Sequence, residues 1–336
     1  MYFLVFQVKF LLNKYLCSAQ TTLFQNKTQN NMKKKTAIIL LLCGCLCQSM
    51  FSIDPVYSFP IPETTVFAGK TISLERYDMR ERFDREQIII AYNHSLSFII
   101  IKRANRYFPI IEPILKENGV PDDFKYLAVI ESNLEPRAVS PAQAAGIWQL
   151  LPKTAQQFGL EVNDEVDERY HIEKSTLAAC KYFKSAFNKY KNWTTVAASY
   201  NAGMGRISTE KENQQVDDSF DMLLTSESSR YVFRILAMKQ FLENPKAFGY
   251  FIERNQFYQT IGTKNVIVKG AIADWTVWAA QNGISYSQLK DFNIWLRDQK
   301  LTNQTGKEYT LQIPNKEDIK FNPANIKIHN PVWVNF

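Results

Sequence analysis

One carboxylate of this sequence is placed where its neighbours could change its chemistry. Glu131 comes at the end of the segment Phe124–Ser132, and Leu127 and Ile130 make the face that it would share apolar. An apolar surrounding disfavours the charged form and raises the pKa of a carboxyl group toward neutrality, which suits a general acid. The same glutamate could instead mark the exposed turn where a helix ends.

Two further segments carry side chains that suit a sugar-binding site. A run of small residues presents the indole of Trp148 and the amide of Gln149 just before Pro152. An indole can stack on a pyranose ring, and an amide can bond to its substituents. Tyr200 and Asn201 precede two glycines and could reach into a cleft. Trp148 could equally be a core residue, and the glycines could be an ordinary helix C-cap.

The sequence gives no support to other catalytic schemes. Its three histidines, His94, His171 and His329, are scattered, and residues 48–336 contain a single cysteine, Cys180, on an apolar helical face. Neither a metal-ligand spacing nor a disulfide framework is present. There is no glycine-rich loop to bind phosphate. We therefore expect no metal and no cofactor.

The net charge of +7 comes from one end of the chain. Residues 1–47 hold six lysines, no arginine and no acidic residue. Removing those six from the 40 basic residues leaves 34 against 33 acidic residues, a net charge of +1. A nearly neutral remainder does not indicate a nucleic-acid partner.

The N-terminal region has the pattern of an export signal. Residues 32–50 begin with Met-Lys-Lys-Lys and continue with about ten apolar residues, too few to span a membrane. We interpret residues 1–31 as a mis-called extension, that is, a segment upstream of the true start of the protein. Leu42–Cys45 resembles a lipobox that would lipidate Cys45, and cleavage near Ser49 explains the segment equally well. Both interpretations predict a protein exported to the periplasm, in the first case with a membrane anchor.

The rest of the chain is predicted to be mainly α-helical. Residues 51–79 carry several prolines and are predicted to be an extended tether. Apolar residues recur at helical spacing over 80–245, where Pro109 and Pro113 are expected to break the first long stretch. Further helices are predicted over 122–134, 152–158, 175–189, 194–200 and 227–244.

A smaller domain follows. After a linker over 246–263, the pattern predicts strand, helix, helix and strand within residues 264–314. Residues 315–336 are left as a C-terminal tail. We therefore expect a helical domain over 80–245 and a small βααβ domain after it.

Four segments together resemble a known family. Glu131-Ser132, Ser140-Pro141, Gly146–Leu150 and Tyr200–Gly203 follow the order and spacing of the lytic transglycosylases of the Slt type. These are goose-lysozyme-like, mostly helical enzymes that cleave peptidoglycan. Residues 264–314 resemble a LysM module, which binds peptidoglycan, although the usual Gly-Asp-Thr is missing.

The resemblance implies roles for particular residues. Glu131 would be the sole catalytic acid, and the residues expected to bind substrate around it are Ser132, Ser140, Gly146, Ile147, Trp148, Gln149, Tyr200 and Asn201. The expected partner is a peptidoglycan glycan strand, bound by a monomer. With one acid, the muramoyl C6 hydroxyl would act as the nucleophile and give a 1,6-anhydro product. The alternatives are a hydrolytic lysozyme-type muramidase and a non-catalytic peptidoglycan-binding protein.

Overall fold

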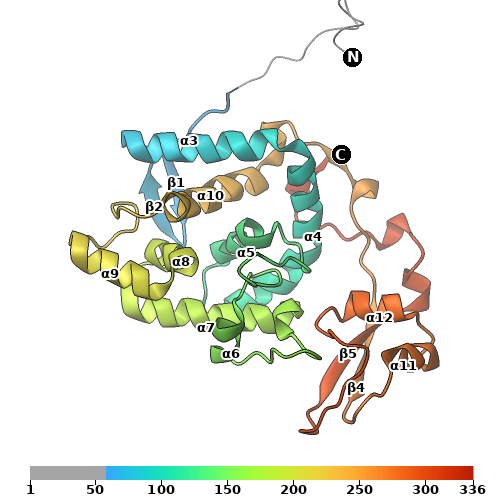
Figure 1. Cartoon of the computed structure of the whole chain (residues 1–336). Helices are drawn as coiled ribbons and strands as arrows, with labels where there is room; N and C mark the ends of the chain where they lie inside the picture. The colour runs from blue at the N-terminus through green and yellow to red at the C-terminus, as the bar shows by residue number, and fades with distance from the viewer. Residues whose placement is uncertain (1–57, 336) are drawn as a thin grey trace, which may run out of the picture. The chain divides into compact units, whose positions relative to one another are not determined.

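The computed structural model describes residues 58–335 (Figure 1). The export signal, the candidate lipidation site Cys45 and the first part of the expected tether lie outside the described residues. Within the described part, no helix is both long enough and apolar enough to cross a membrane.

Helices dominate the first part of the described chain. They are α3 (Tyr77–Tyr92), α4 (His94–Glu117), α5 (Lys125–Ser132), α6 (Pro152–Gln157), α7 (Ile172–Tyr190), α8 (Trp193–Ala202), α9 (Met204–Gln214) and α10 (Ser226–Glu243). Short 3₁₀ turns include Asp122–Phe124 before α5 and Glu168–Tyr170 before α7. The short α5 contacts α4 and α10, and its position in the middle of the helices is visible in Figure 1.

Every helix predicted from apolar periodicity is present, with slightly different ends. The helix that the pattern does not predict is α9, and the reason is its composition. Ile207 is its only buried residue, so its sequence shows almost no apolar stripe. Side-chain caps support other helix starts, such as Asn192 on the amide of Thr194 at α8.

Two prolines do not break the helix that contains them. The expected break at Pro109 and Pro113 is wrong: α4 continues through both, and the interruption lies at Asn93, between α3 and α4. Both prolines are exposed and lie four residues apart, on one side of the helix. A helix accommodates a missing amide donor most easily on its solvent side, where it can bend away.

The expected tether over 51–79 is wrong for its described part. Strands β1 (Thr64–Phe67) and β2 (Lys70–Ser73) form an antiparallel hairpin. Phe67 and Leu74 are fully buried in the main hydrophobic core. Apolar burial therefore makes this hairpin part of the helical domain.

The C-terminal βααβ prediction is confirmed. Strands β4 (Thr263–Val268) and β5 (Tyr309–Pro314) pair in antiparallel fashion, and helices α11 (Trp275–Gln281) and α12 (Tyr286–Phe292) lie between them in the chain. We call residues 264–317 the C-terminal module. Its core is a second hydrophobic cluster that includes Trp275, Leu289 and Leu311.

The expected linker and tail are both parts of the helical domain. Tyr250 and Phe257 before the module, and Ile326 and Trp333 after it, are buried in the main core. The indole of Trp333 donates a hydrogen bond to the carbonyl of Leu242, 2.6 Å away. The short strands β3 (Ile252–Glu253) and β6 (Val334–Asn335) pair in parallel. The remaining 3₁₀ turns are Pro245–Phe248, Arg254–Gln256, Lys316–Asp318, Pro323–Asn325 and Pro331–Trp333.

Candidate active site

Glu131 lies in the last turn of a helix that is almost entirely buried. All residues of α5 from Tyr126 to Ile130 are buried, and Glu131 itself is partly buried. The helix ends at Asn133, which takes the left-handed conformation with φ +52°. Asparagine is among the few non-glycine residues that adopt this conformation readily. Because the helix ends here, Glu131 lies in its last turn, directly after the buried residues of α5.

The carboxyl of Glu131 has one strong hydrogen-bond donor. The hydroxyl of Tyr231, on α10, donates to Oε1 of Glu131 across 2.5 Å. Burial raises the pKa of Glu131 from 4.5 to about 7, because it disfavours the charged form. The Tyr231 hydrogen bond and the charge of Arg234 oppose this shift, whereas the charge of Glu227 adds to it. At neutral pH the protonated and the ionised forms of the Glu131 carboxyl are therefore both populated.

Three residues around Glu131 were not predicted from the sequence. Glu227, Tyr231 and Arg234 follow each other at intervals of four and three residues in α10, which places them on one face of the helix. That shared spacing on one helix face was the available signal, but other polar residues of α10 obscure it. Both Tyr231 and Tyr200 are influenced by the charge of Glu131, and burial raises the pKa of both hydroxyls well above 10. Both tyrosines therefore remain neutral donors.

The loop over 138–150 is a compact turn rather than a flexible connection. Ala145 bridges to both Val139 and Leu150. The amide of Gly146 donates to the carbonyl of Ala138 at 2.9 Å. Gly146 has φ +77°, and a Cβ atom there would lie 2.0 Å from the carbonyl oxygen of Arg169. This position therefore requires glycine for two reasons, its backbone conformation and the close approach of the main chain at Arg169.

Two side chains connect this loop to the helices that flank it. The hydroxyl of Ser132, next to Glu131, donates to the carbonyl of Ile147 at 2.8 Å. The hydroxyl of Tyr200, on α8, donates to the carbonyl of Trp148 at 2.7 Å. The structure therefore brings together Glu131, Ser132, Tyr200 and the loop.

The indole of Trp148 is not available to a sugar ring. Its exposed fraction is 0%, and its Nε1 donates to the hydroxyl of Thr176 at 2.8 Å. The ring lies in the main core against Phe183. The expected stacking role is wrong, because a large apolar ring is stabilised more by complete burial than by exposure at a turn. The side chain of Ile147 is likewise buried, with 1% exposed.

The other predicted binding residues have local partners. The amide nitrogen of Gln149 donates to the carbonyls of Ala138 and Gly146, and so closes the loop on itself. The hydroxyl of Ser140 accepts the amide of Ala144 in the same loop. Asn201 accepts a hydrogen bond from Ser228 at the start of α10. These contacts position the three side chains around the loop and α10.

Other acidic residues near this region have basic partners. Glu135, four residues after Glu131, forms an ion pair with Arg103 of α4. Asp123 accepts from Lys239 at 2.7 Å. Among residues 58–335, no cluster of His, Cys, Asp or Glu side chains could hold a metal ion. Of the described carboxylates, Glu227 is the one whose charge affects the pKa of Glu131.

Comparisons with known proteins agree with this architecture. Residues 108–222 match the transglycosylase SLT domain, and residues 264–317 match the soluble lytic transglycosylase C-terminal LysM-like domain. The mainly helical, lysozyme-like fold with a small LysM-like module is thereby confirmed.

Curated relatives and solved structures are similar to parts of the chain. Membrane-bound lytic murein transglycosylase D of Escherichia coli K12 is 29% identical over 232 residues, which cover 67% of this chain and 50% of the relative. Membrane-bound lytic murein transglycosylase F of Idiomarina loihiensis is 28% identical over 147 residues, covering 39% and 31%. The 70 kDa soluble lytic transglycosylase of Escherichia coli aligns with a TM-score of 0.35 at 21% identity, over 41% of this chain and 24% of that one.

The chain spans about half the length of the first of these relatives. The two family matches lie in the same order as the helical domain and the C-terminal module, and the first contains Glu131, the loop and Tyr200. This chain therefore contains a segment that matches the transglycosylase SLT domain, followed by one that matches a LysM-like domain, and it is homologous to membrane-bound lytic murein transglycosylase D.

Proposed function

We propose that this protein is a peptidoglycan lytic transglycosylase whose sole catalytic acid is Glu131. The observation that carries the proposal is the partly buried carboxyl of Glu131, with a pKa of about 7 and a hydrogen bond from Tyr231. A group with this pKa can donate a proton and then accept one at neutral pH. The SLT domain match and the similarity to lytic murein transglycosylases support the choice of substrate.

The reaction needs only one protein carboxyl because the substrate supplies the nucleophile. Protonated Glu131 donates its proton to the oxygen that links N-acetylmuramic acid to N-acetylglucosamine, and the bond from C1 to that oxygen breaks. The C6 hydroxyl of the muramoyl residue then attacks C1, and its proton passes to the carboxylate of Glu131. The product is a 1,6-anhydro ring, no water is consumed, and Glu131 returns to its starting state. The N-acetyl group stabilises the positive charge that develops at C1 between the two steps.

The neighbouring residues hold the loop and the acid in place for this reaction. Ser132 and Tyr200 bind the loop through main-chain carbonyls, and Gln149 closes it. Ser140, Gln149 and Asn201 are the substrate-binding side chains of the proposal. Trp148 and Ile147 contribute through their main chain, since their side chains are buried.

The mass of the products tests the reaction type. With purified sacculi as substrate, we expect muropeptides that end in anhydro-muramic acid, each one water lighter than the corresponding reducing product. Products with reducing ends would show hydrolysis instead. Binding to sacculi without any loss of turbidity would show a non-catalytic wall-binding protein.

The charge of Glu227 makes hydrolysis the strongest alternative. Most glycoside hydrolases use a second carboxylate near the scissile bond, and Glu227 is on the same helix face as Tyr231. In the proposed reaction Glu227 is not a base, so a Glu227→Gln variant should still form anhydro products. A variant that loses all product formation while the wild type releases reducing ends would favour hydrolysis.

The pH dependence should report the state of Glu131, and replacing Tyr231 should shift it. The proton donor is lost as pH rises through about 7, so kcat/KM should fall above that value. Tyr231→Phe removes a donor that stabilises the carboxylate, and the pKa of Glu131 should rise. A hydrogen bond to a charged group contributes about 1.5–3 kcal/mol, so the alkaline limb of kcat/KM should move upward by about one to two pH units.

A second tyrosine provides the matched control. The hydroxyl of Tyr250 donates to the carbonyl of Ala91 in the main core, at 2.7 Å. Tyr250→Phe also deletes one buried hydroxyl, but it should leave the alkaline limb where it is. If the alkaline limb of kcat/KM did not move in Tyr231→Phe, the result would show that Glu131 does not control the pH profile.

For location, we propose export to the periplasm. Two curated relatives, the transglycosylases D and F, are named membrane-bound, and the leader over 32–50 has the pattern of an export signal. We propose a lipid anchor at Cys45, which would add the mass of a diacylglyceryl group to the mature N-terminus. Cleavage near Ser49 would leave an unmodified N-terminus of lower mass.

A further inference from the structure

The hydrophobic core of the C-terminal module is completed by residues of the helical domain. Ala145, Val166 and Tyr170 belong to the same buried cluster as the module's own apolar side chains. Ala145 lies in the loop over 138–150, next to Gly146, and is 1% exposed. Because this loop passes beside Glu131, the module and the candidate active site share a structural element.

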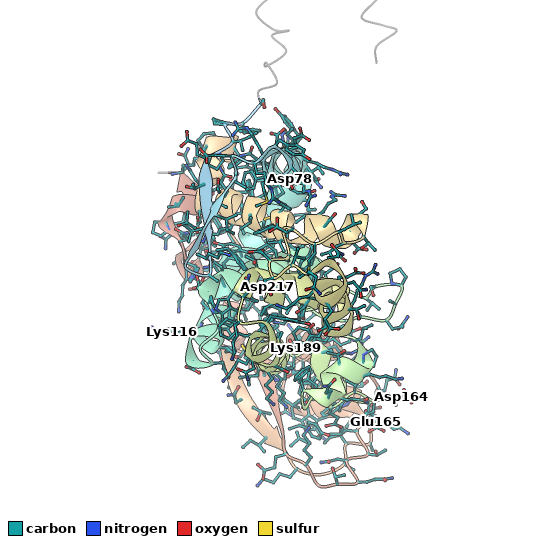
Figure 2. The ribbon with its side chains drawn as sticks, turned by 90° about the vertical axis from the view of Figure 1, so that its left-hand side faces the viewer. Asp78, Lys116, Asp164, Glu165, Lys189 and Asp217 are labelled. Carbon is teal, nitrogen blue, oxygen red and sulfur yellow. The ribbon has the colours of Figure 1, made fainter. Side chains whose placement is uncertain are left out.

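Main-chain hydrogen bonds extend this contact beyond the core. The amide of Asp167 donates to the carbonyl of Trp295, and the amide of Arg297 donates to the carbonyl of Glu165, at 2.9 and 2.8 Å. The carboxylate of Glu165, labelled in Figure 2, accepts from both the amide and the hydroxyl of Thr302. Main-chain bonds of this kind set the register between the two parts more firmly than exposed side-chain pairs do.

A group of charged residues closes the same interface. The ammonium of Lys307 lies 2.6 Å from Glu161 and 3.1 Å from Glu168. The hydroxyl of Tyr309 also donates to Glu161. Burial opposes the charged form of Glu168, yet its hydrogen bonds and its lysine neighbours hold its pKa below 4.5. The module is therefore joined to the helical domain by packing, main-chain bonds and ion pairs.

Arg169 transmits this contact to the loop. Its side chain is 8% exposed and binds both carboxylate oxygens of Asp167. Its Nη1 donates to two loop carbonyls, that of Gln143 at 2.6 Å and that of Leu150 at 3.1 Å. Its own carbonyl oxygen lies against Gly146. One buried guanidinium thus joins the segment held by the module to the middle and to the C-terminal end of the loop.

We propose that Arg169 is a positioning residue for Glu131, and that the C-terminal module, by holding Asp167, is part of the catalytic apparatus. This inference rests on the proposed lytic function. Arg169 acts through the loop, because it holds the carbonyls of Gln143 and Leu150 in place. Other carbonyls of the same loop accept the hydroxyls of Ser132 and Tyr200. A guanidinium with fixed donors is suited to this because it satisfies a carboxylate and two carbonyls at once.

This inference differs from a wall-binding role for the module in what it predicts. A module that only binds glycan would change the KM for sacculi and leave turnover of short soluble glycan strands intact. A module that positions the loop changes kcat on those short strands, because a small displacement near the reacting atoms has a large effect on rate.

The first experiment replaces Arg169 in the full chain. For Arg169→Met we expect kcat on short soluble glycan strands to fall about tenfold or more, with KM changed less than about twofold. Arg169→Lys keeps one charged donor and should recover part of this loss. Arg254→Met is the matched control, since Arg254 donates to the carbonyl of Ile326 outside both the loop and the module. A kcat for Arg169→Met equal to that of the control would overturn the proposal.

The second experiment does not depend on activity. Leu289 is fully buried in the module core, and Leu289→Ala leaves a cavity there without changing any residue of the loop. Hydrogen–deuterium exchange should then accelerate in the module and in residues 138–150, but not in α10. Faster exchange in the module with unchanged exchange in the loop would refute the structural coupling.

The two experiments separate the inference from the proposed function. A wild-type protein without lytic activity would refute the proposed function, whereas the exchange measurement would still report whether the module holds the loop. Normal melting temperatures for Arg169→Met and Arg169→Lys would exclude general unfolding as the cause of a slower reaction.

Discussion

Glu131→Gln should reduce the release of anhydro-muropeptides by about 10²–10⁴-fold, the range that a single general acid–base group contributes. The substitution keeps the size of the side chain and an oxygen that can accept from Tyr231, whose hydroxyl lies 2.5 Å from the native carboxyl. It removes the only proton that the reaction can transfer to the leaving oxygen. Initial rates on purified sacculi, with product masses, measure the effect.

The same variant allows the fold to be checked, because it should be more stable at high pH. The pKa of Glu131 is raised from 4.5 to about 7 in the folded state, so the folded protein binds more protons than the unfolded chain between these values. The free energy of unfolding of the wild type therefore falls as pH rises from about 4.5 to about 7. Glutamine cannot ionise and does not incur this loss.

The expected difference is measurable by denaturant titration. At pH 8 the Glu131→Gln variant should exceed the wild type in unfolding free energy by on the order of 3 kcal/mol, and at pH 4 the two should be equal. An inactive variant that is also less stable at pH 8 would point to a folding defect. Substantial residual lytic activity in a stable variant would contradict the assignment of Glu131.

Gly146→Ala should disrupt the loop and destabilise the protein. A Cβ atom at this position would lie 2.0 Å from the carbonyl oxygen of Arg169, and the φ of +77° is unfavourable for alanine. The conformational strain and the overpacking together should lower the unfolding free energy by about 2–5 kcal/mol. The loop can relieve the clash only by moving away from Arg169, so the lytic rate should fall as well. Thermal unfolding and rates on sacculi measure both effects.

Another glycine separates the two causes. Gly69, in the turn between β1 and β2, has almost the same φ of +78°, but a Cβ atom there would meet nothing within 4 Å. Gly69→Ala therefore carries the conformational strain alone, about 1–2 kcal/mol, and should leave lytic activity intact. If the two variants were equally stable, contact with Arg169 would not be what requires glycine at 146.

Local patterns in the sequence predicted the elements of the fold well where apolar periodicity was strong. The helices around Glu131 and the βααβ order of the C-terminal module both follow from such patterns. Prediction failed where long-range packing decided the outcome. α4 runs through Pro109 and Pro113 because both prolines face solvent, which depends on how the helix lies against the core.

The structure of the two end segments of the helical domain was not predicted, for the same reason. The hairpin over 64–73 and the segment that contains Trp333 have little periodicity, and only contacts with distant parts of the core order them. The indole of Trp333 bonds to Leu242, 91 residues earlier in the chain. No local pattern reports such a contact.

By itself, the sequence determined which residue is the candidate acid and which short segments accompany it, because an apolar helix that ends in Glu131 and a small-residue turn after it are local features. The tertiary structure alone decided the partners of that acid. Tyr231 is 100 residues away in the chain, and its contact with Glu131 depends on the packing of α10 against α5. It also placed Trp148 in the core and brought Arg169 to the loop. The pKa of Glu131 and the shape of the loop are products of burial and long-range contact, which single-residue patterns do not contain.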